Sequence, residues 1–565
     1  MKVDRQLLLL AASTVVVLVL GTFAFLQSDP AEGWLTALYK AVQLFSMNSG
    51  VIGDGMPTPV ALEFARWLAL GTLIAAVYGT VQALLGHLRS KFRIAFIEGH
   101  HIVCGAGKRG IVIARSLRSK VDDGKGKVVV VELDENNAAL GELRNLGIDV
   151  VIGNALDAAV LQSAGVAKAR SLVAVTGGDE KNLSICSEVK ENLNSFCELH
   201  AGVESWAWRS FFLDRMKPGI RLESYLSQAA RSLMLNFVAS EAAREPAMRE
   251  NGVRIVIEAS LETRQELLRA AILTLQISGE KKPTIDVTSV AAGEEDAFFD
   301  RFPSASLVAE LRWHRASASQ VFPEGGETVP DFAVFSLGSD IETLEAAERF
   351  WMRHETPDHR IIACLDEDNE AAYMGSIVKK SRDIQIENLI KFGLGSKHPL
   401  EPDIDERAMK CHAIYVANER AKNPQYGNKP GDLPDNWAEL KERYKESNRL
   451  AAAQIEVASI AWRTRGETPA LQMLTHLARC EHMRWMAEKA MFGWRWSGSL
   501  QRTSRDDLKL KHNLLIPYAA LTSPEKDKDF NTFLWALDTS DEELHALGLD
   551  EKTLEMVRFS REVRV

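Results

Sequence analysis

The chain lacks several features that mark common classes of site. Its six cysteines are scattered singly among 565 residues, without a CxxC pair or a Cys/His spacing typical of a metal site. This pattern argues against a zinc site and a disulfide framework, and it fits a reducing compartment. Positive charge is not in excess either, because the formal net charge is −10 at pH 7. A protein that binds nucleic acid would carry a basic face, so we expect no nucleic acid partner.

Long apolar runs are missing from most of the chain, and the mean hydropathy is only −0.11. That value excludes a transporter built of many membrane helices. Strongly apolar sequence is confined to the part before residue 90. With 46% hydrophobic and 25% charged residues, the chain has the composition of folded protein. At roughly 150 residues per domain the length predicts three or four domains, of which a small one lies in a membrane.

Two apolar runs near the N-terminus are each long enough to span a bilayer. Residues 7–26 carry no charge, and neither do residues 67–85. A secretory signal is the alternative for the first run, because Lys2 and Arg5 precede it, although the run is long for a signal. Basic residues lie before the first run and after the second, and such residues hold the end of a membrane helix in the cytoplasm. This pattern predicts a two-pass protein of the inner (plasma) membrane with both termini in the cytoplasm.

The segment between the two runs resembles the pore of two-helix potassium channels. Residues 33–46 predict an amphipathic helix too short to span, and a glycine-rich loop follows it. The residues that fall on the family's filter are Ser49, Gly50, Val51, Ile52, Gly53 and Asp54. Val51 stands at a glycine position of the family and Ile52 at its bracing aromatic, which predicts a cation pore with little preference for potassium over sodium. A two-helix anchor with an outer loop is the alternative.

A glycine-rich turn lies behind the basic junction, in residues 101–110. It follows a short apolar strand, opens a helix, and precedes a second strand that ends at Glu132, 22 residues after Gly110. This order is typical of dinucleotide-binding folds. In such a fold Gly105 permits the tight turn, Gly107 the approach of a pyrophosphate and Gly110 the contact of helix with strand. The helix N-terminus faces the phosphates, and Glu132 would bind ribose hydroxyls.

Strands and helices continue in the same order to residue 225, and the run resembles the RCK domain (regulator of potassium conductance). The likeness includes the turn at Gly153-Asn154-Ala155 and the segment 175–182, with Asn154 in place of the family's aspartate. It implies a regulatory sensor of a nucleotide or an ion, and the ligand we expect is an adenine nucleotide (NAD, ADP or ATP). We expect no catalytic residue and no metal site. The expected binding residues are Gly105, Ala106, Gly107, Lys108, Arg109, Gly110, Glu132, Leu133, Asp134, Asn154, Ala155 and Thr176. An NAD-dependent oxidoreductase is a rival interpretation, but no acid-base residue is placed for a substrate.

The same order of elements repeats from residue 253, which predicts a second, divergent RCK-type unit. Its first turn, residues 258–264, contains no glycine. A pyrophosphate cannot approach a backbone that carries side chains there, so we expect no dinucleotide in this unit. Packing between subunits is the expected role, and a second ligand site is the alternative.

The C-terminal part resembles the RyR repeat, a small helical module named for ryanodine receptors. The likeness rests on Glu481-His-x-x-Trp485, on Lys489-x-x-x-Gly-Trp494 and on residues 512–518, where Asn513 replaces the family's proline. Tryptophan rings beside cations could stack a base and hold a phosphate, so a nucleotide-like small molecule is the expected ligand. The candidates are Asn448, Arg449, Glu481, His482, Trp485, Lys489, Trp494, Arg495 and Tyr518. A tryptophan core, or a surface that docks a protein, is the alternative.

The expected fold class is a membrane α domain with two helices and a re-entrant loop, then α/β Rossmann-type RCK domains, then an all-α module. The expected segments are a pore-like domain 1–95, an RCK domain 96–250, a degenerate RCK-like domain 251–400, a linker 401–436 and a removable RyR-type domain 437–565. Together they predict a homotetrameric, ligand-gated channel in membrane lipid that passes monovalent cations. A membrane-anchored nucleotide sensor that does not conduct is the first alternative, and an oxidoreductase is the second.

Overall fold

The computed structural model describes residues 5–47, 58–119, 127–193, 197–213, 215, 219–244, 252–324, 329–354, 360–365, 384–389, 405–427, 432–549 and 551–562. The chain divides into two compact units, Met1–Ile97 and Glu98–Val565, which are taken separately below. The expected filter residues, Ser49 to Asp54, lie outside the described residues.

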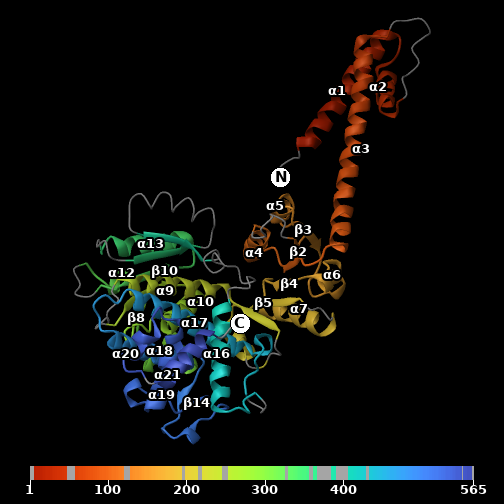
Figure 1. Ribbon diagram of the computed structural model, residues 1–565. Helices are drawn as coiled ribbons and strands as arrows, with labels where there is room; N and C mark the ends of the chain where they lie inside the picture. Colours follow the sequence, from red (N-terminus) through yellow and green to blue (C-terminus); the bar gives the residue numbers. More distant parts are fainter. Residues whose placement is uncertain are drawn as a thin grey trace. The chain divides into compact units, whose positions relative to one another are not determined.

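Helices make up the described part of the first unit: α1 (Arg5–Ser28), α2 (Trp34–Gln43), η1 (Leu44–Ser46) and α3 (Val60–Ala95) (Figure 1). Leu8–Ser28 and Val60–Val81 are long and apolar enough to cross a membrane. α2 and η1 together form the short helix expected from the sequence. α1 and α2 approach closely at Gly21, where an added Cβ would lie 2.9 Å from the Cβ of Ala41.

The second unit begins with a six-stranded parallel sheet in the order β3-β2-β1-β4-β5-β6. Its strands are β1 (His101–Cys104), β2 (Val128–Glu132), β3 (Asp149–Ile152), β4 (Ser171–Ala174), β5 (Glu198–Gly202) and β6 (Ile220–Glu223). Its helices are α4 (Lys108–Ser119), α5 (Ala139–Asn145), α6 (Ala158–Ser163), η2 (Val166–Lys168), α7 (Asp179–Asn192) and α8 (Trp206–Leu213). The strand order reverses between β1 and β4, and ligands of doubly wound sheets bind at that point.

A second parallel sheet follows the long connecting helix α9 (Tyr225–Arg244), in the order β12-β11-β10-β7-β8-β9. Its strands are β7 (Arg254–Ala259), β8 (Thr284–Val287), β9 (Glu310–Trp313), β10 (Phe332–Ser336), β11 (Arg360–Leu365) and β12 (Ile384–Asn388). Its helices are α10 (Leu261–Thr274), α11 (Glu294–Arg301), η3 (Ala305–Leu307), α12 (Ala318–Val321) and α13 (Asp340–Trp351). Counted from β7, the strand order is the same as in the first sheet, which confirms the expected repeat.

The repeat extends to one hydrogen bond after the fourth strand of each sheet. After β4 the side chain of Asn182 accepts the N–H of Thr176 at 2.8 Å. After β10 the hydroxyl of Thr343 accepts the N–H of Leu337, also at 2.8 Å. In both copies the acceptor lies six residues beyond the donor, in the first turn of the next helix, so different side chains perform the same backbone capping.

Helices dominate the C-terminal part, with one departure from an all-α module. The elements are α16 (Glu406–Lys422), η5 (Trp437–Glu439), α17 (Glu442–Arg463), α18 (Ala470–Met491), β13 (Arg495–Trp496), η6 (Arg502–Ser504), β14 (Lys511–His512), η7 (Tyr518–Ala520), α19 (Ser523–Phe533), η8 (Leu534–Ala536), α20 (Asp541–Ala546) and α21 (Glu551–Glu562). β13 and β14 pair in parallel, joining Trp496 to His512.

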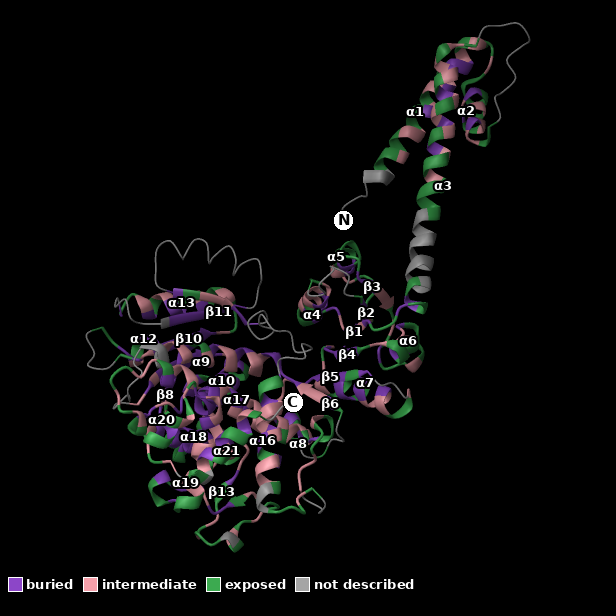
Figure 2. Cartoon of the chain, viewed as in Figure 1, coloured by how far each residue is buried: buried purple, intermediate pink, exposed green. Residues whose placement is uncertain are grey.

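The C-terminal helices share one hydrophobic core with the second sheet. Leu474 and Leu477 of α18 belong to the same buried cluster as Leu267 and Ala271 of α10, and the two helices lie together in Figure 2. His476 also contacts the carbonyl oxygen of Ile277 at 3.0 Å. Removing residues 437–565 would expose this core to water, so the expectation of a freely removable module does not fit the packing.

The segment expected to be a linker, residues 401–436, contains the 17-residue helix α16 packed against α17. Apolar residues on α16 are buried, among them Ala408 and Ile414. Just before the helix, Asp405 accepts two hydrogen bonds from Arg449, at 2.7 and 2.9 Å. One acidic residue of the expected linker, Asp405, therefore forms a buried ion pair with a partner distant in the sequence.

Candidate functional site

The turn between β1 and α4 needs glycine at two positions. Gly105 has φ +104°, and an added Cβ there would lie 2.9 Å from the carbonyl oxygen of Val175. At Gly110 an added Cβ would lie 1.9 Å from the carbonyl oxygen of Gly105. At Gly107, by contrast, an added Cβ would meet nothing within 4 Å. Gly105 and Gly110 therefore let the helix and the strands pack closely, and Gly107 leaves the backbone of the turn open to its surroundings.

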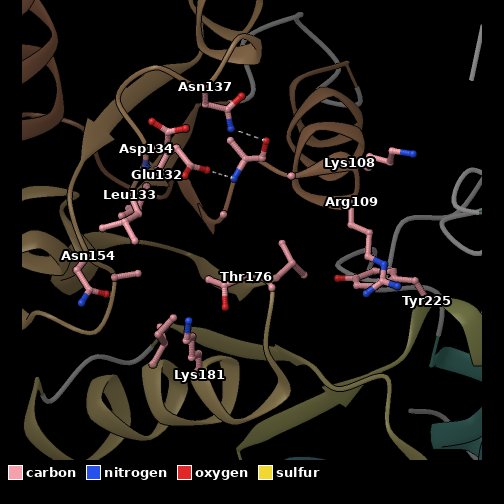
Figure 3. Close-up of a pocket in the computed structure, with 18 of the residues that line it drawn as sticks. Lys108, Arg109, Glu132, Leu133, Asp134, Asn137, Asn154, Thr176, Lys181 and Tyr225 are labelled. Carbon is pink, nitrogen blue, oxygen red and sulfur yellow. Dashed lines mark hydrogen bonds between the residues drawn. The ribbon is translucent and has the colours of Figure 1, made fainter. Parts of the chain in front are cut away.

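This turn faces a cavity of about 830 Å³ at the carboxyl ends of β1, β2 and β4 (Figure 3). All twelve residues expected to bind the nucleotide line it, except Gly110, which lies at the contact of α4 with the turn. The structure adds residues that the sequence did not single out: Asn137, Lys181, Tyr225, Ser260, Glu262, Thr263 and Leu389. Ser260, Glu262 and Thr263 belong to the second Rossmann-type unit, so their part in this cavity follows only from the tertiary structure.

Glu132 holds the glycine-rich turn. Its Oε2 accepts the N–H of Ala106 at 2.6 Å, and its Oε1 accepts the N–H of Asp134 at 2.9 Å. From the other side, the side-chain amide of Asn137 donates to the carbonyl oxygen of Ala106 at 3.1 Å. A carboxylate oxygen can accept more than one hydrogen bond, so Glu132 keeps acceptor capacity for a ribose hydroxyl.

Two other expected residues shape the loops at the mouth. Asn154 accepts the N–H of Leu156 through its side chain at 3.0 Å, which closes the turn after β3. Thr176 donates its hydroxyl to Asn182 at 2.7 Å. The side-chain amide of Asn182 in turn donates to the carbonyl oxygen of Gly202 at 2.7 Å. The Asn182 bonds tie together the ends of the neighbouring strands β4 and β5, whereas the Asn154 bond is local to the turn after β3.

Cations lie at the start of α4. Lys108 and Arg109 occupy its first turn and line the cavity, and Arg109 Nη1 lies 3.1 Å from Glu204 Oε1. The N-terminus of a helix carries partial positive charge and unpaired N–H groups, which favour an anion. An open glycine, a helix N-terminus and two cations form a cradle that fits the phosphates of a nucleotide.

Burial shifts the pKa of two ionisable side chains on β1 toward their uncharged forms. Burial raises the pKa of the Cys104 thiol to about 12, so the sulfur stays protonated. Burial, with the charge of Arg170, lowers the pKa of His101 to about 4. Among the described residues, no group of three or more His, Cys, Asp or Glu side chains is placed to hold a metal ion.

In the second Rossmann-type unit, side chains of that unit close the corresponding turn. Arg264 of α10 donates to the carbonyl oxygen of Ala259 at 2.6 Å and to that of Ser289 at 3.2 Å. The carboxylate of Glu258, at the end of β7, accepts from the Ser289 hydroxyl and from the N–H of Ala318. A guanidinium group thus lies where the first unit has its open turn.

A second cavity, of about 660 Å³, lies in the C-terminal part. Five of the nine expected ligand residues line it: Asn448, Glu481, His482, Trp485 and Lys489. The other four do not. Arg449 is bound to Asp405, and Trp494 and Tyr518 are buried in the core. Arg495 is exposed on β13. For Trp494 and Tyr518 the core interpretation therefore fits better than the ligand interpretation.

The wall of this cavity comes partly from α16. His412, Tyr415 and Asn418 line it, although they stand in the segment expected to be a linker. His512 also lines the cavity, with its ring centroid 4.9 Å from that of Trp485. Burial, together with the charges of Arg505 and Lys489, lowers the pKa of His512 to about 4. Four Lys or Arg side chains and four acidic side chains line the cavity beside these aromatic rings.

A known protein family matches this chain over the first Rossmann-type unit, and known proteins are similar to part of the chain. Residues 101–205 match the TrkA-N domain model. The chain is 28% identical over 180 residues to potassium channel protein 1 of Methanocaldococcus jannaschii, covering 28% of this chain and 50% of that protein. It is 32% identical over 159 residues to an uncharacterized protein of Methanothermus fervidus, covering 28% of this chain and 23% of that protein. The chain thus spans half or less of the length of these relatives.

A solved structure is also similar in part. The crystal structure of the GsuK RCK domain aligns with a TM-score of 0.33 and 13% identity, over 53% of this chain and 75% of that one. Residues 101–205 thus match a TrkA-N domain, and the matched part of the chain is similar to a potassium channel protein. The pore, the RyR-type module and the binding role of each site residue stay predictions.

Proposed function

We propose that the chain is a subunit of a ligand-gated cation channel whose cytosolic Rossmann-type units sense nucleotides. One observation carries the proposal: a TrkA-N domain with an open glycine cradle follows, in the same chain, two apolar helices with a short helix between them. One of the similar proteins is named a potassium channel protein. Such a channel would be a homotetramer in the plasma membrane with both termini in the cytoplasm.

The ligand of the first unit is an adenine nucleotide: NAD, ADP or ATP. Its phosphates would lie over Gly107 at the N-terminus of α4, near Lys108 and Arg109. A ribose hydroxyl would donate to Glu132. The second Rossmann-type unit is expected to bind no nucleotide, because the Arg264 guanidinium occupies the turn where the phosphates would lie. Its role is then structural, since it shares a core with the C-terminal helices.

The bound nucleotide regulates the protein and is not turned over. A ligand that prefers one arrangement of the cytosolic units shifts the population of channel states by its difference in affinity. A second ligand, nucleotide-like, would bind the C-terminal cavity against Trp485 with its anionic group toward Lys489. That cavity would let the protein respond to two signals.

Two measurements test the proposal. Mass spectrometry of small molecules released from purified protein, followed by calorimetry with NAD, ADP and ATP, should identify the nucleotide of the first unit. Current through the protein in a planar bilayer, with potassium on one side and sodium on the other, should reverse near zero, because Val51 and Ile52 interrupt the family filter. A reversal potential near the potassium equilibrium potential would show that the filter selects potassium. If no current flowed with any nucleotide, the protein would be a membrane-anchored sensor that does not conduct.

A matched variant tests the pore segment itself. Asp54→Asn should lower cation conductance most at low salt, where an acidic ring is least screened. Asp29→Asn, outside the expected filter, is the control. Equal conductance of both variants at low salt would place the ion path elsewhere.

A further inference from the structure

Arg109 is the residue that connects the nucleotide cavity to the start of α9. It lies in the first turn of α4, lines the cavity, and keeps 45% of its side chain exposed. Its Nη1 lies 3.1 Å from Oε1 of Glu204, whose side chain is only 18% exposed. Figure 3 shows Arg109 beside Tyr225, the first residue of α9.

Glu204 at the same time caps α9. Its Oε1 accepts the N–H of Tyr225 at 3.3 Å, and its Oε2 accepts the N–H of Leu226 at 3.3 Å and the hydroxyl of Ser224 at 2.8 Å. A carboxylate is favoured at a helix N-terminus, where unpaired N–H groups and partial positive charge meet. One carboxylate therefore joins the first turn of α4 to the first turn of α9.

The helix α9 connects the two Rossmann-type units. Tyr225 at its start belongs to the core of the first sheet. Further along, Leu233, Met234 and Phe237 belong to the core that includes β7 and α10. A movement at the start of α9 can therefore reach the second Rossmann-type unit, because the later part of the same helix is buried in the core of that unit.

We propose that Arg109 exchanges partners, leaving Glu204 for a phosphate of the bound nucleotide, and that this exchange releases α9 from α4. A guanidinium group binds phosphate, as it binds carboxylate, through two parallel N–H bonds, and the terminal phosphate of ADP carries more charge than a carboxylate. Glu204 would still face the N–H groups of α9 but would no longer be anchored to the turn, so its hydrogen bonds to Tyr225 and Leu226 would open at a different rate. This inference rests on nucleotide binding by the first unit and names the contact through which that binding is communicated.

The test is a double-mutant cycle on the full-length protein, with ADP affinity measured by calorimetry. Arg109→Ala should weaken ADP binding, since a phosphate ligand is lost. Glu204→Gln should tighten it by about two- to fivefold, the range for releasing a partly exposed ion pair. In the Arg109→Ala background, Glu204→Gln should have no effect, because the carboxylate competes only through Arg109. A matched control is Glu142→Gln, which removes the partner of Arg115 on the same helix, away from the cavity.

Hydrogen exchange gives a second readout that does not need a Glu204 variant. Saturating ADP should change the exchange of the Tyr225 and Leu226 amides in the wild type and leave it unchanged in Arg109→Ala. The proposed change of partner by Arg109 would be wrong if Glu204→Gln altered ADP affinity equally in the wild type and in Arg109→Ala. It would also be wrong if ADP altered hydrogen exchange equally in those two proteins. Neither result would affect the proposal that the first Rossmann-type unit binds a nucleotide. A wild-type protein that binds no adenine nucleotide would instead overturn the proposed function of the first unit.

Discussion

Glu132, at the end of β2, accepts a hydrogen bond of 2.6 Å from the backbone N–H of Ala106, in the glycine-rich turn after β1. The same carboxylate accepts the N–H of Asp134 at 2.9 Å. An ionised carboxylate has acceptors on both oxygens and no donor, so it suits a position between two N–H groups. The residue expected to bind a ribose therefore also holds the shape of the phosphate cradle.

Glu132→Gln is expected to weaken adenine nucleotide binding by roughly tenfold, because the amide has only one acceptor oxygen and its NH₂ group would face an N–H donor. Calorimetry with ADP on the purified protein measures the change. Glu135→Gln, three residues along the same chain segment and exposed, is the control. Equal affinities of the two variants would show that Glu132 has no role in the cradle.

The three glycines of the turn should respond differently to substitution. Gly107→Ala should fold normally, since its Cβ meets nothing, whereas Gly107→Asp should abolish nucleotide binding by adding negative charge in the phosphate space. Gly110→Ala should lower the free energy of unfolding by about 2 kcal/mol or more, because its Cβ would overlap the Gly105 carbonyl. Thermal unfolding and calorimetry separate the two effects. Normal ADP binding by Gly107→Asp would remove the ligand from this turn.

Asp405→Asn is expected to destabilise the contact between α16 and its neighbours by about 3 kcal/mol, because Arg449 and Arg221 would lose a buried partner. Asp435→Asn, which removes an exposed partner of Arg420, should cost far less. Denaturant unfolding of the full-length variants measures both. Equal losses would mean that the Asp405 pair contributes no more than a surface ion pair.

The same residue predicts an acid limit of stability. Burial alone would raise the pKa of Asp405, but the hydrogen bonds and charge of Arg449 outweigh it and lower the pKa to about 2. Because the folded-state pKa lies below the unfolded one, the contribution is fully present above about pH 4 and is lost as the pH falls toward 2. In Asp405→Asn this part of the acid transition should be absent. An acid transition identical to that of the wild type would contradict it.

His512 predicts a separate pH dependence. Its pKa of about 4 lies below the ordinary value of about 6.5, so between these values the unfolded chain binds more protons than the folded one. The N–H of Leu514 donates to Nδ1 of His512 at 3.1 Å, which also favours the neutral ring. Unfolding free energy should therefore fall as the pH drops from about 6.5 to 4, by at most about 1.4 kcal/mol per pH unit for this group.

The check is thermal unfolding of His512→Gln over that pH range. Its melting temperature should vary less steeply with pH than that of the wild type, because glutamine does not titrate. His545→Gln, an exposed histidine on α20, is the control. A slope as steep in His512→Gln as in the wild type would assign the dependence to other groups.

Local patterns were enough to predict the Rossmann-type units. The turn at Gly105, the helix that begins at Lys108 and the strand that ends at Glu132 lie within about thirty residues, and steric needs of the backbone dictate their residue types. The repeat beginning at residue 253 was visible for the same reason, since strand and helix periods persist after the glycines are lost. The short helix between the apolar runs was predicted by its amphipathic pattern.

Only the tertiary structure decided which residues distant in sequence share a site. Arg264 closes its own turn by reaching Ser289. Ser260, Glu262 and Thr263 line the cavity of the first Rossmann-type unit, and Asp405 pairs with Arg221, 184 positions away. The segment that contains α16 was predicted to be a linker with one helical patch, because it is rich in Pro, Gly, Asp, Lys and Asn. The burial of a charged residue with its partner is visible only after folding. The sequence by itself determined the order of the elements and the chemistry of the glycine turn. The fold decided the rest, because contacts between units depend on packing that no local pattern encodes.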